Sequence, residues 1–84
     1  MKLRDEDGVP LKVGDHITFS FGIPPTSVLG VIVEKGTHLW IECLHPEDVK
    51  PKQERLDRLM KWYPIWKAPK ARVTAAKRDY RPAP

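Results

Sequence analysis

The distribution of proline constrains this chain more than any other feature of its sequence. The 84 residues contain nine prolines, roughly twice the share of an average protein. Proline has no amide hydrogen to donate and fixes its own φ, so it interrupts helices and the interior of sheets. Because most of the prolines follow residue 45, the second half is expected to be segmented and partly extended. These prolines are Pro46, Pro51, Pro64, Pro69, Pro82 and Pro84.

The length of the chain allows one hydrophobic core. A chain of this size buries only about 60 to 65% of its unfolded surface, so we predict a single domain over residues 1–78 and a flexible tail over residues 79–84. No apolar run approaches the roughly 20 residues that span a bilayer, and the N-terminus lacks the apolar core of a signal peptide. The single cysteine, Cys43, excludes an internal disulfide. Together these features favour a cytoplasmic protein.

Alternation of polar and apolar residues in the first half predicts a mainly β fold. Residues 16–21 alternate with β-branched and aromatic types on the apolar face, which is typical of a half-buried strand. Residues 28–34 form an apolar run around Gly30, and glycine inside a strand marks a bulge or a sharp bend. Residues 38–44 resume the alternation. We therefore predict a small, strongly bent antiparallel β-barrel of four or five strands.

The second half has the pattern of a helix followed by a basic tail. Residues 51–63 contain proline only at the first position, and an apolar stripe recurs there at spacings of three and four until Pro64 ends the segment. The opposite face of this predicted helix is basic. Residues 71–75 could form a short closing strand. The apolar stripe consists of Leu56, Leu59, Met60 and Tyr63, and the basic face of Lys52, Arg55, Arg58 and Lys61.

The glycine spacing in the first half resembles a known motif. Gly14-Asp15 opens the first predicted strand, Gly22 follows eight residues after Gly14, and Gly30 begins the core of the second strand. This spacing, over residues 11–34, resembles the KOW motif of small Src-homology-type β-barrels. The resemblance implies a barrel that contacts RNA, the ribosome or RNA polymerase, as such domains do in ribosomal proteins and bacterial transcription elongation factors.

Charge is divided by position along the chain. Residues 1–49 carry four Lys/Arg against eight Asp/Glu, a net charge of −4, whereas residues 50–84 carry eleven bases against three acids, a net charge of +8. A cationic half of this kind favours a polyanion or an acidic protein surface as partner.

Three aromatic residues stand among lysines in the cationic half: Trp62, Tyr63 and Trp66. Aromatic side chains stack on unpaired nucleobases, and neighbouring Lys and Arg side chains neutralise phosphates. We therefore predict a nucleic-acid-binding module that favours RNA over DNA. An alternative role for the same aromatics is to pin the helix to the barrel, because so small a domain needs large side chains in its core. The predicted nucleic-acid contacts are Lys52, Arg55, Arg58, Lys61, Trp62, Trp66, Lys67, Lys70, Arg72, Lys77 and Arg78.

The competing hypothesis is a protein adaptor or regulator. Trp40 and an exposed loop at Pro24 and Pro25 would then contact a host machine such as RNA polymerase or the ribosome, and a phage or mobile element could encode such an accessory protein. We do not expect an enzyme, a cofactor or a metal site, because no catalytic motif or paired metal-ligand spacing is present. Cys43 shares the predicted apolar face of its strand and is expected to be a buried, inert thiol.

Overall fold

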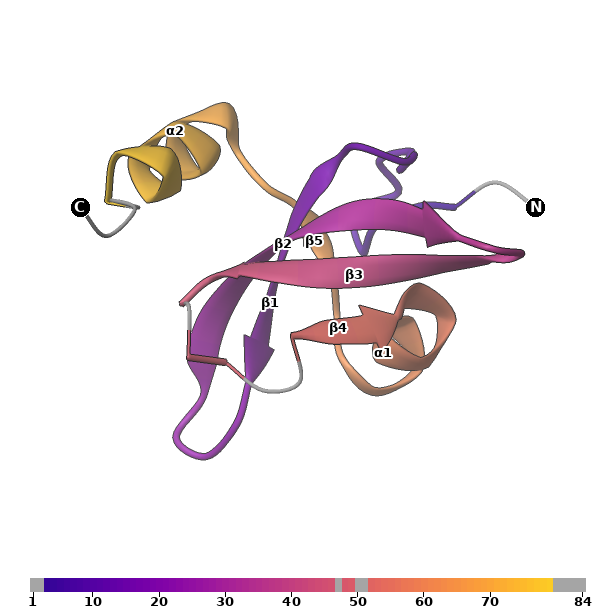
Figure 1. The fold of residues 1–84 in the computed structure, drawn as a ribbon, viewed down its shortest axis with the longest axis horizontal. Helices are drawn as coiled ribbons and strands as arrows, with labels where there is room; N and C mark the ends of the chain where they lie inside the picture. The colour runs from indigo at the N-terminus through magenta and orange to yellow at the C-terminus, as the bar shows by residue number, and fades with distance from the viewer. Residues whose placement is uncertain (1–2, 47, 50–51, 80–84) are drawn as a thin grey trace.

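The computed structural model describes residues 3–46, 48–49 and 52–79, with the backbone alone described for residues 75–79 (Figure 1). Five strands and two helices follow one another along this part of the chain. They are β1 (His16–Phe21), β2 (Thr26–Lys35), β3 (His38–His45), β4 (Gln53–Arg55), α1 (Leu56–Trp62), β5 (Trp66–Lys67) and α2 (Lys70–Asp79).

The strands form one antiparallel sheet in the order β4-β3-β2-β1-β5, so the prediction of a mainly β fold is confirmed. β1, β2 and β3 form a meander, and β5 returns from the far end of the chain to pair with β1 (Figure 1). β4 and β5 are the two edges, and no pairing joins them within the described residues. The sheet is therefore open there.

A bulge or a bend was predicted at Gly30, and the structure has a bulge there. The pairing of β2 with β3 shifts register between Leu29 and Gly30, as in a bulge. A side chain at Gly30 would place its Cβ 2.6 Å from Cγ2 of Ile41 and 3.1 Å from the carbonyl oxygen of Glu42. The two strands thus approach more closely than any residue with a Cβ permits, and this approach requires glycine.

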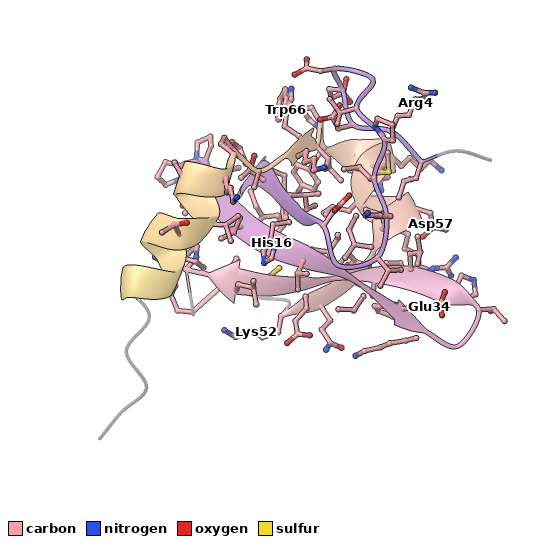
Figure 2. The ribbon with its side chains drawn as sticks, turned by 90° about the horizontal axis from the view of Figure 1, so that it is seen from above. Arg4, His16, Glu34, Lys52, Asp57 and Trp66 are labelled. Atoms are coloured by element: carbon pink, nitrogen blue, oxygen red, sulfur yellow. The ribbon has the colours of Figure 1, made fainter. Side chains whose placement is uncertain are left out.

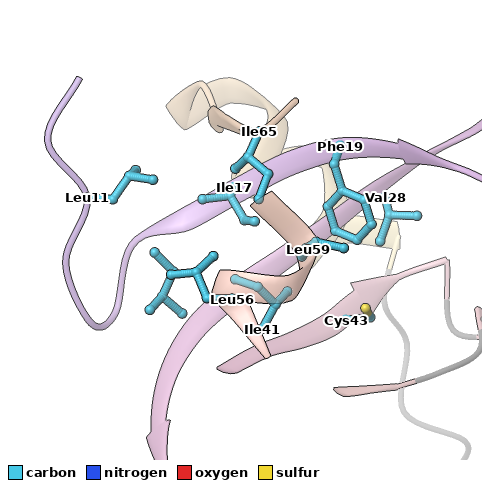
Figure 3. Packing of buried hydrophobic residues seen from close by; sticks show 10 residues of the cluster. Leu11, Ile17, Phe19, Val28, Ile41, Cys43, Leu56, Leu59 and Ile65 are labelled. Carbon is cyan, nitrogen blue, oxygen red and sulfur yellow. The ribbon is translucent and has the colours of Figure 1, made fainter. Parts of the chain in front are cut away.

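The core lies between the sheet and α1 (Figure 3). Alternation along β1 buries Ile17 and Phe19, and α1 contributes Leu56 and Leu59, three residues apart on one face. Ile65 follows α1 and is also buried. The complete cluster comprises Leu11, Ile17, Phe19, Val28, Ile32, Ile41, Cys43, Leu56, Leu59 and Ile65.

The charged N-terminal stretch is part of the folded domain. The carboxylate of Asp5, which is 9% exposed, accepts three backbone hydrogen bonds. Its Oδ1 accepts from the amides of Asp7 at 2.9 Å and Val9 at 2.8 Å, and its Oδ2 accepts from the amide of Lys67 at 2.9 Å. The last of these bonds joins the start of the chain to β5.

Two further contacts hold the same stretch in place. The amide of Glu6 donates to the carbonyl of Ile65 at 2.9 Å, and the side chain of Leu11 belongs to the core. The outer edge of β5 is therefore covered by residues of the N-terminal stretch, which protects a strand of only two residues.

The predictions for the second half need two corrections. Residues 53–55 form β4 instead of the first turn of a helix, because they pair with β3 opposite Trp40, Ile41 and Glu42. Residues 71–75 lie in α2 and not in a strand, since the edge that a closing strand would use is already taken by β5 and the N-terminal stretch. The carbonyl of Pro69 begins α2 by accepting from the amides of Arg72 and Val73. Of the predicted tail, residues 80–84 lie outside the described residues.

Substitution of Asp5 with alanine is expected to lower the free energy of unfolding by about 2 kcal/mol, because three backbone donors lose a charged acceptor. Urea unfolding at neutral pH measures this loss. Equal stability of Asp5→Ala and the wild type would contradict this role of the carboxylate.

The effect of Asp5 should depend on pH. Burial disfavours the charged form, but the backbone hydrogen bonds and the nearby Lys67 outweigh it and hold the pKa of Asp5 below its ordinary value of 3.8. A carboxylate with a lowered folded pKa stabilises the protein above its unfolded pKa and loses this effect as pH falls through the folded pKa. The stability difference between the wild type and Asp5→Ala should therefore begin to shrink near pH 3.8 and vanish at lower pH.

Candidate functional site

An open pocket of about 380 Å³ lies beside α1, between this helix and one end of the sheet. β1, β3 and β4 contribute to its wall, Val49 of the connection between β3 and β4 adds to it, and α1 with the residue after it contributes the rest. Most of the lining is apolar or aromatic, with one acid and one base. The lining residues are Phe19, Phe21, Cys43, Val49, Glu54, Arg58, Leu59, Trp62 and Tyr63.

The aromatic wall is fixed by packing. Phe19 and Phe21 lie on the same side of β1 because side chains two residues apart in a strand share a face. Tyr63 packs against both, with ring centroids 6.2 Å from Phe19 and 5.6 Å from Phe21 and with tilted rings. The amide of Tyr63 donates to the carbonyl of Leu59 at 2.9 Å, which holds the ring at the end of α1. These contacts give the pocket one rigid side.

Trp62 and Tyr63 point to different environments although they are neighbours in sequence. Tyr63 is half-buried against the core, as expected for a residue that pins the helix. Trp62 ends α1 and is 75% exposed at the mouth of the pocket. The pinning role is therefore confirmed for Tyr63, and Trp62 is left as an exposed aromatic surface. Trp66 on β5 is 38% exposed.

Two basic residues of the predicted helix face, Arg58 and Lys61, lie on α1. Arg58 lines the pocket, and it lies four residues before Trp62 on the same side of the helix. Lys61 is exposed in the last turn. Lys52 is also exposed, and its carbonyl accepts from the amide of Cys43 at 2.7 Å, so its backbone lies next to the pocket wall.

Arg55 does not belong to this group, and the prediction of one continuous basic helix face is wrong because β4 interrupts it. The guanidinium of Arg55 donates to both carboxylate oxygens of Asp57, at 3.1 and 2.7 Å. The hydrogen bond from Arg55 is the main cause that holds the pKa of Asp57 below its ordinary value, and desolvation opposes it. The charge of Arg55 is thus largely compensated by its neighbour.

The basic residues that follow α1 in the chain lie away from the pocket. α2 and α1 lie at different ends of the sheet in both views, and Trp66 lies on the opposite side of the molecule from Lys52 (Figure 2). Lys67 Nζ is 4.0 Å from Asp15 Oδ2, and the guanidinium of Arg72 donates to the carbonyl of Ser27 at 3.5 Å.

Three further predicted contacts belong to α2. Lys70 is exposed at the start of this helix. Lys77 and Arg78 lie in its second half, where only the backbone is described, so the prediction for their side chains lies outside the described residues.

Cys43 is buried, as predicted from its place in the strand, and it lies at the inner wall of the pocket. Burial is the main cause that raises the pKa of its thiol; Lys52 opposes the shift, and Glu42 and Glu54 add to it. A thiol with a raised pKa is a poor nucleophile at neutral pH. Within the part of the chain that the structure describes, no group of three or more His, Cys, Asp or Glu side chains could hold a metal ion.

The residues that the adaptor hypothesis names do not line the pocket. Trp40 is half-buried on β3, and Lys35 Nζ lies 5.9 Å from its ring centroid. Pro24 and Pro25 are exposed in the turn between β1 and β2, as expected for a loop. The adjacent Ile23 is fully exposed at the same turn. Ile23 is not among the predicted contacts, although an apolar residue directly before two prolines in a loop was the available sequence signal.

Glu54 is the site residue with no signal in the sequence. Its place in the pocket follows from the pairing of β4 with β3, where it stands opposite Ile41 on the core side of the sheet. A helix over the same residues would have placed it differently.

None of the described helices is long and apolar enough to cross a membrane. No family model matches the chain, and neither curated proteins nor solved structures yield a significant match.

The thiol of Cys43 should react roughly tenfold or more slowly with a disulfide reagent in the folded protein than in urea, because burial restricts access and raises the pKa. Absorbance of the released thiolate measures the rate, and Cys43 is the only thiol in the chain.

Trp62→Ala should speed the reaction of the folded protein by opening the mouth of the pocket, whereas Trp66→Ala, on β5, should leave it unchanged. Equal rates in the folded and unfolded protein would contradict the placement of the thiol.

Proposed function

We propose that this protein binds single-stranded nucleic acid, RNA in preference to DNA, at the pocket and the exposed end of α1. The observation that carries the proposal is the exposure of Trp62 at the mouth of an aromatic pocket that Arg58 also lines. A large aromatic side chain that is 75% exposed contributes little to the core. Its position suits it to stack on a partner.

The chemistry of the site fits an unpaired strand. Stacking of a base on an aromatic side chain contributes about 1 to 3 kcal/mol and tolerates any base. Arg58 and Lys61 stand within one turn of Trp62, where they can neutralise the phosphates on either side of a stacked base. The described residues offer Arg58 no ion-pair partner within 4.0 Å. RNA is favoured because its loops present unpaired bases that can be splayed onto such a surface.

We further propose that the open sheet is a form of the small Src-homology-type barrel that the glycine spacing resembles. Three features support this assignment: the bulge at Gly30, the helix α1 between β4 and β5 in the chain, and the return of β5 to pair with β1. Contact with RNA, the ribosome or RNA polymerase, and a cytoplasmic location, follow only as proposals from the resemblance.

Binding of labelled single-stranded RNA should fall with salt and depend on Trp62. If Lys52, Arg58 and Lys61 each neutralise one phosphate, the logarithm of the affinity should fall with the logarithm of salt concentration with a slope of about −2. Trp62→Ala should weaken binding by about tenfold, the effect of one lost stacking contact. Fluorescence anisotropy over a salt series measures both quantities.

The matched controls are Arg58→Gln and Arg55→Gln. Arg58→Gln should lower the salt slope by about 0.7, whereas Arg55→Gln should leave it nearly unchanged because Asp57 already compensates that charge. Trp66→Ala serves as the control for Trp62→Ala, since Trp66 lies outside the pocket. Failure of the wild type to bind RNA at low salt, or equal effects of the paired variants, would overturn the proposal.

The complete exposure of Ile23 favours a second candidate function, the protein adaptor. Ile23 and the two prolines that follow present an apolar, conformationally restricted tip. The partner would be a host machine such as RNA polymerase or the ribosome, as suits an accessory protein of a phage or mobile element. Retention on immobilised bacterial RNA polymerase or ribosomes after nuclease treatment should then be lost in Ile23→Ser or Trp40→Ala and kept in Trp62→Ala. The opposite pattern would exclude this function.

A further inference from the structure

We infer that the pocket selects an unpaired guanine, with Glu54 as the residue that reads the base. The inference rests on the proposed function and specifies which base of a bound strand would enter the site. An acidic side chain, Glu54, lines the pocket, although a site that bound only phosphates would disfavour a negative charge there. Among the residues that line the pocket, Glu54 is the only acidic residue and Arg58 is the only basic residue.

The fold directs Glu54 into the pocket. β4 pairs with β3 so that Glu54 stands opposite Ile41, a fully buried core residue, and side chains at paired positions share a face of the sheet. Glu54 is half-buried, and its Oε1 accepts from the amide of Arg55 at 3.0 Å. This bond restricts the carboxylate, and Oε2 has no hydrogen-bond partner among the described residues. Oε2 is therefore free to accept from a ligand, and Oε1 keeps a second lone pair that can accept another hydrogen bond.

Glu54 and Arg58 both line the pocket, but no ion pair joins them in the described part of the chain. A carboxylate in this position repels phosphate and weakens general binding of a polyanion. The same carboxylate becomes favourable when a ligand brings hydrogen-bond donors to it, because a half-buried acceptor gains most from a donor that replaces lost water. The site thus suits a base whose edge carries donors.

Guanine is the base that meets this requirement. Its Watson–Crick edge presents two adjacent donors, N1–H and N2–H, which a carboxylate can accept together. Adenine and cytosine each turn an acceptor nitrogen toward the carboxylate beside their amino group, and uracil offers one donor between two carbonyl oxygens. Each of these bases would place an acceptor against the acceptor-only carboxylate, which leaves polar groups unpaired on desolvation.

The remaining walls fit the same ligand. The volume of about 380 Å³ lies in the lower part of the range for small-molecule sites, which suits a single base with part of its sugar. Trp62 at the mouth and Tyr63 at the wall supply aromatic surfaces for the ring. Arg58 supplies the positive charge for the phosphate attached to that nucleotide.

The test compares short oligouridine strands that carry one central guanine, adenine or cytosine with the unsubstituted strand. The guanine strand should bind the wild type about tenfold tighter than the others, as expected for a two-bond base contact. Glu54→Gln should abolish this preference and leave binding of the unsubstituted strand equal or slightly tighter, because it removes a negative charge. Glu42→Gln is the matched control: it makes the same charge change on the adjacent strand but does not line the pocket.

Cys43 provides a second readout that needs no variant. The guanine strand should slow the reaction of this thiol in the wild type at a concentration where the unsubstituted strand does not, because the base fills the pocket in front of it. A protein damaged by Glu54→Gln would instead weaken binding of every strand. In that case the protection of Cys43 in the wild type decides the question.

Equal binding of the four strands to the wild type, or a guanine preference that survives Glu54→Gln, would overturn the inference and leave the proposed function standing. Absence of binding by every strand at low salt would overturn both. A guanine preference that Glu42→Gln keeps and Glu54→Gln loses supports the assignment.

Discussion

The buried carboxylate of Asp5 is the interaction on which the rest of this small structure depends. β5 has two residues and cannot hold its place by pairing with β1 alone. Asp5 accepts from the amide of Lys67 across 62 positions of sequence and from two amides of its own loop, so one side chain fixes both the N-terminal stretch and β5. Loss of this charged acceptor is expected to cost about 2 kcal/mol, which is a sizeable share of the roughly 5 to 15 kcal/mol that stabilises a typical domain.

The position of β5 in turn determines the pocket. Ile65, one residue before β5, is buried in the core, so the chain between α1 and β5 is held at both ends. This short connection turns Tyr63 inward against Phe19 and Phe21 and leaves Trp62 at the surface. From the sequence, either aromatic could have packed on the core or faced a partner. In the structure Tyr63 packs on the core, and Trp62 is exposed at the surface.

The charge division along the sequence is not a charge division in space. The bases of residues 50–84 are spread over β4, α1, β5 and α2, and several meet acids: Arg55 pairs with Asp57, and Lys67 approaches Asp15 of the acidic half. Among the described residues, Arg58 lines the pocket, Lys61 precedes Trp62 in the last turn of α1, and the backbone of Lys52 lies next to the pocket wall. A net charge of +8 over 35 residues thus does not identify which basic residues share one surface.

Features that depend on neighbouring residues could be predicted from the sequence. Alternation gave β1 to β3 and the burial of Cys43, Gly30 marked the bend, and Pro64 marked the end of α1. The tertiary structure decided the features that depend on distant partners. Residues 53–55 are a strand because β3 offers an edge, and residues 71–75 are helical because β5 and the N-terminal stretch already occupy the edge beside β1. Asp5 and Glu54 owe their surroundings to segments far away in sequence. Local patterns record which face of an element is apolar, but a hydrogen bond between distant segments forms only when the whole chain has brought its donor and acceptor together.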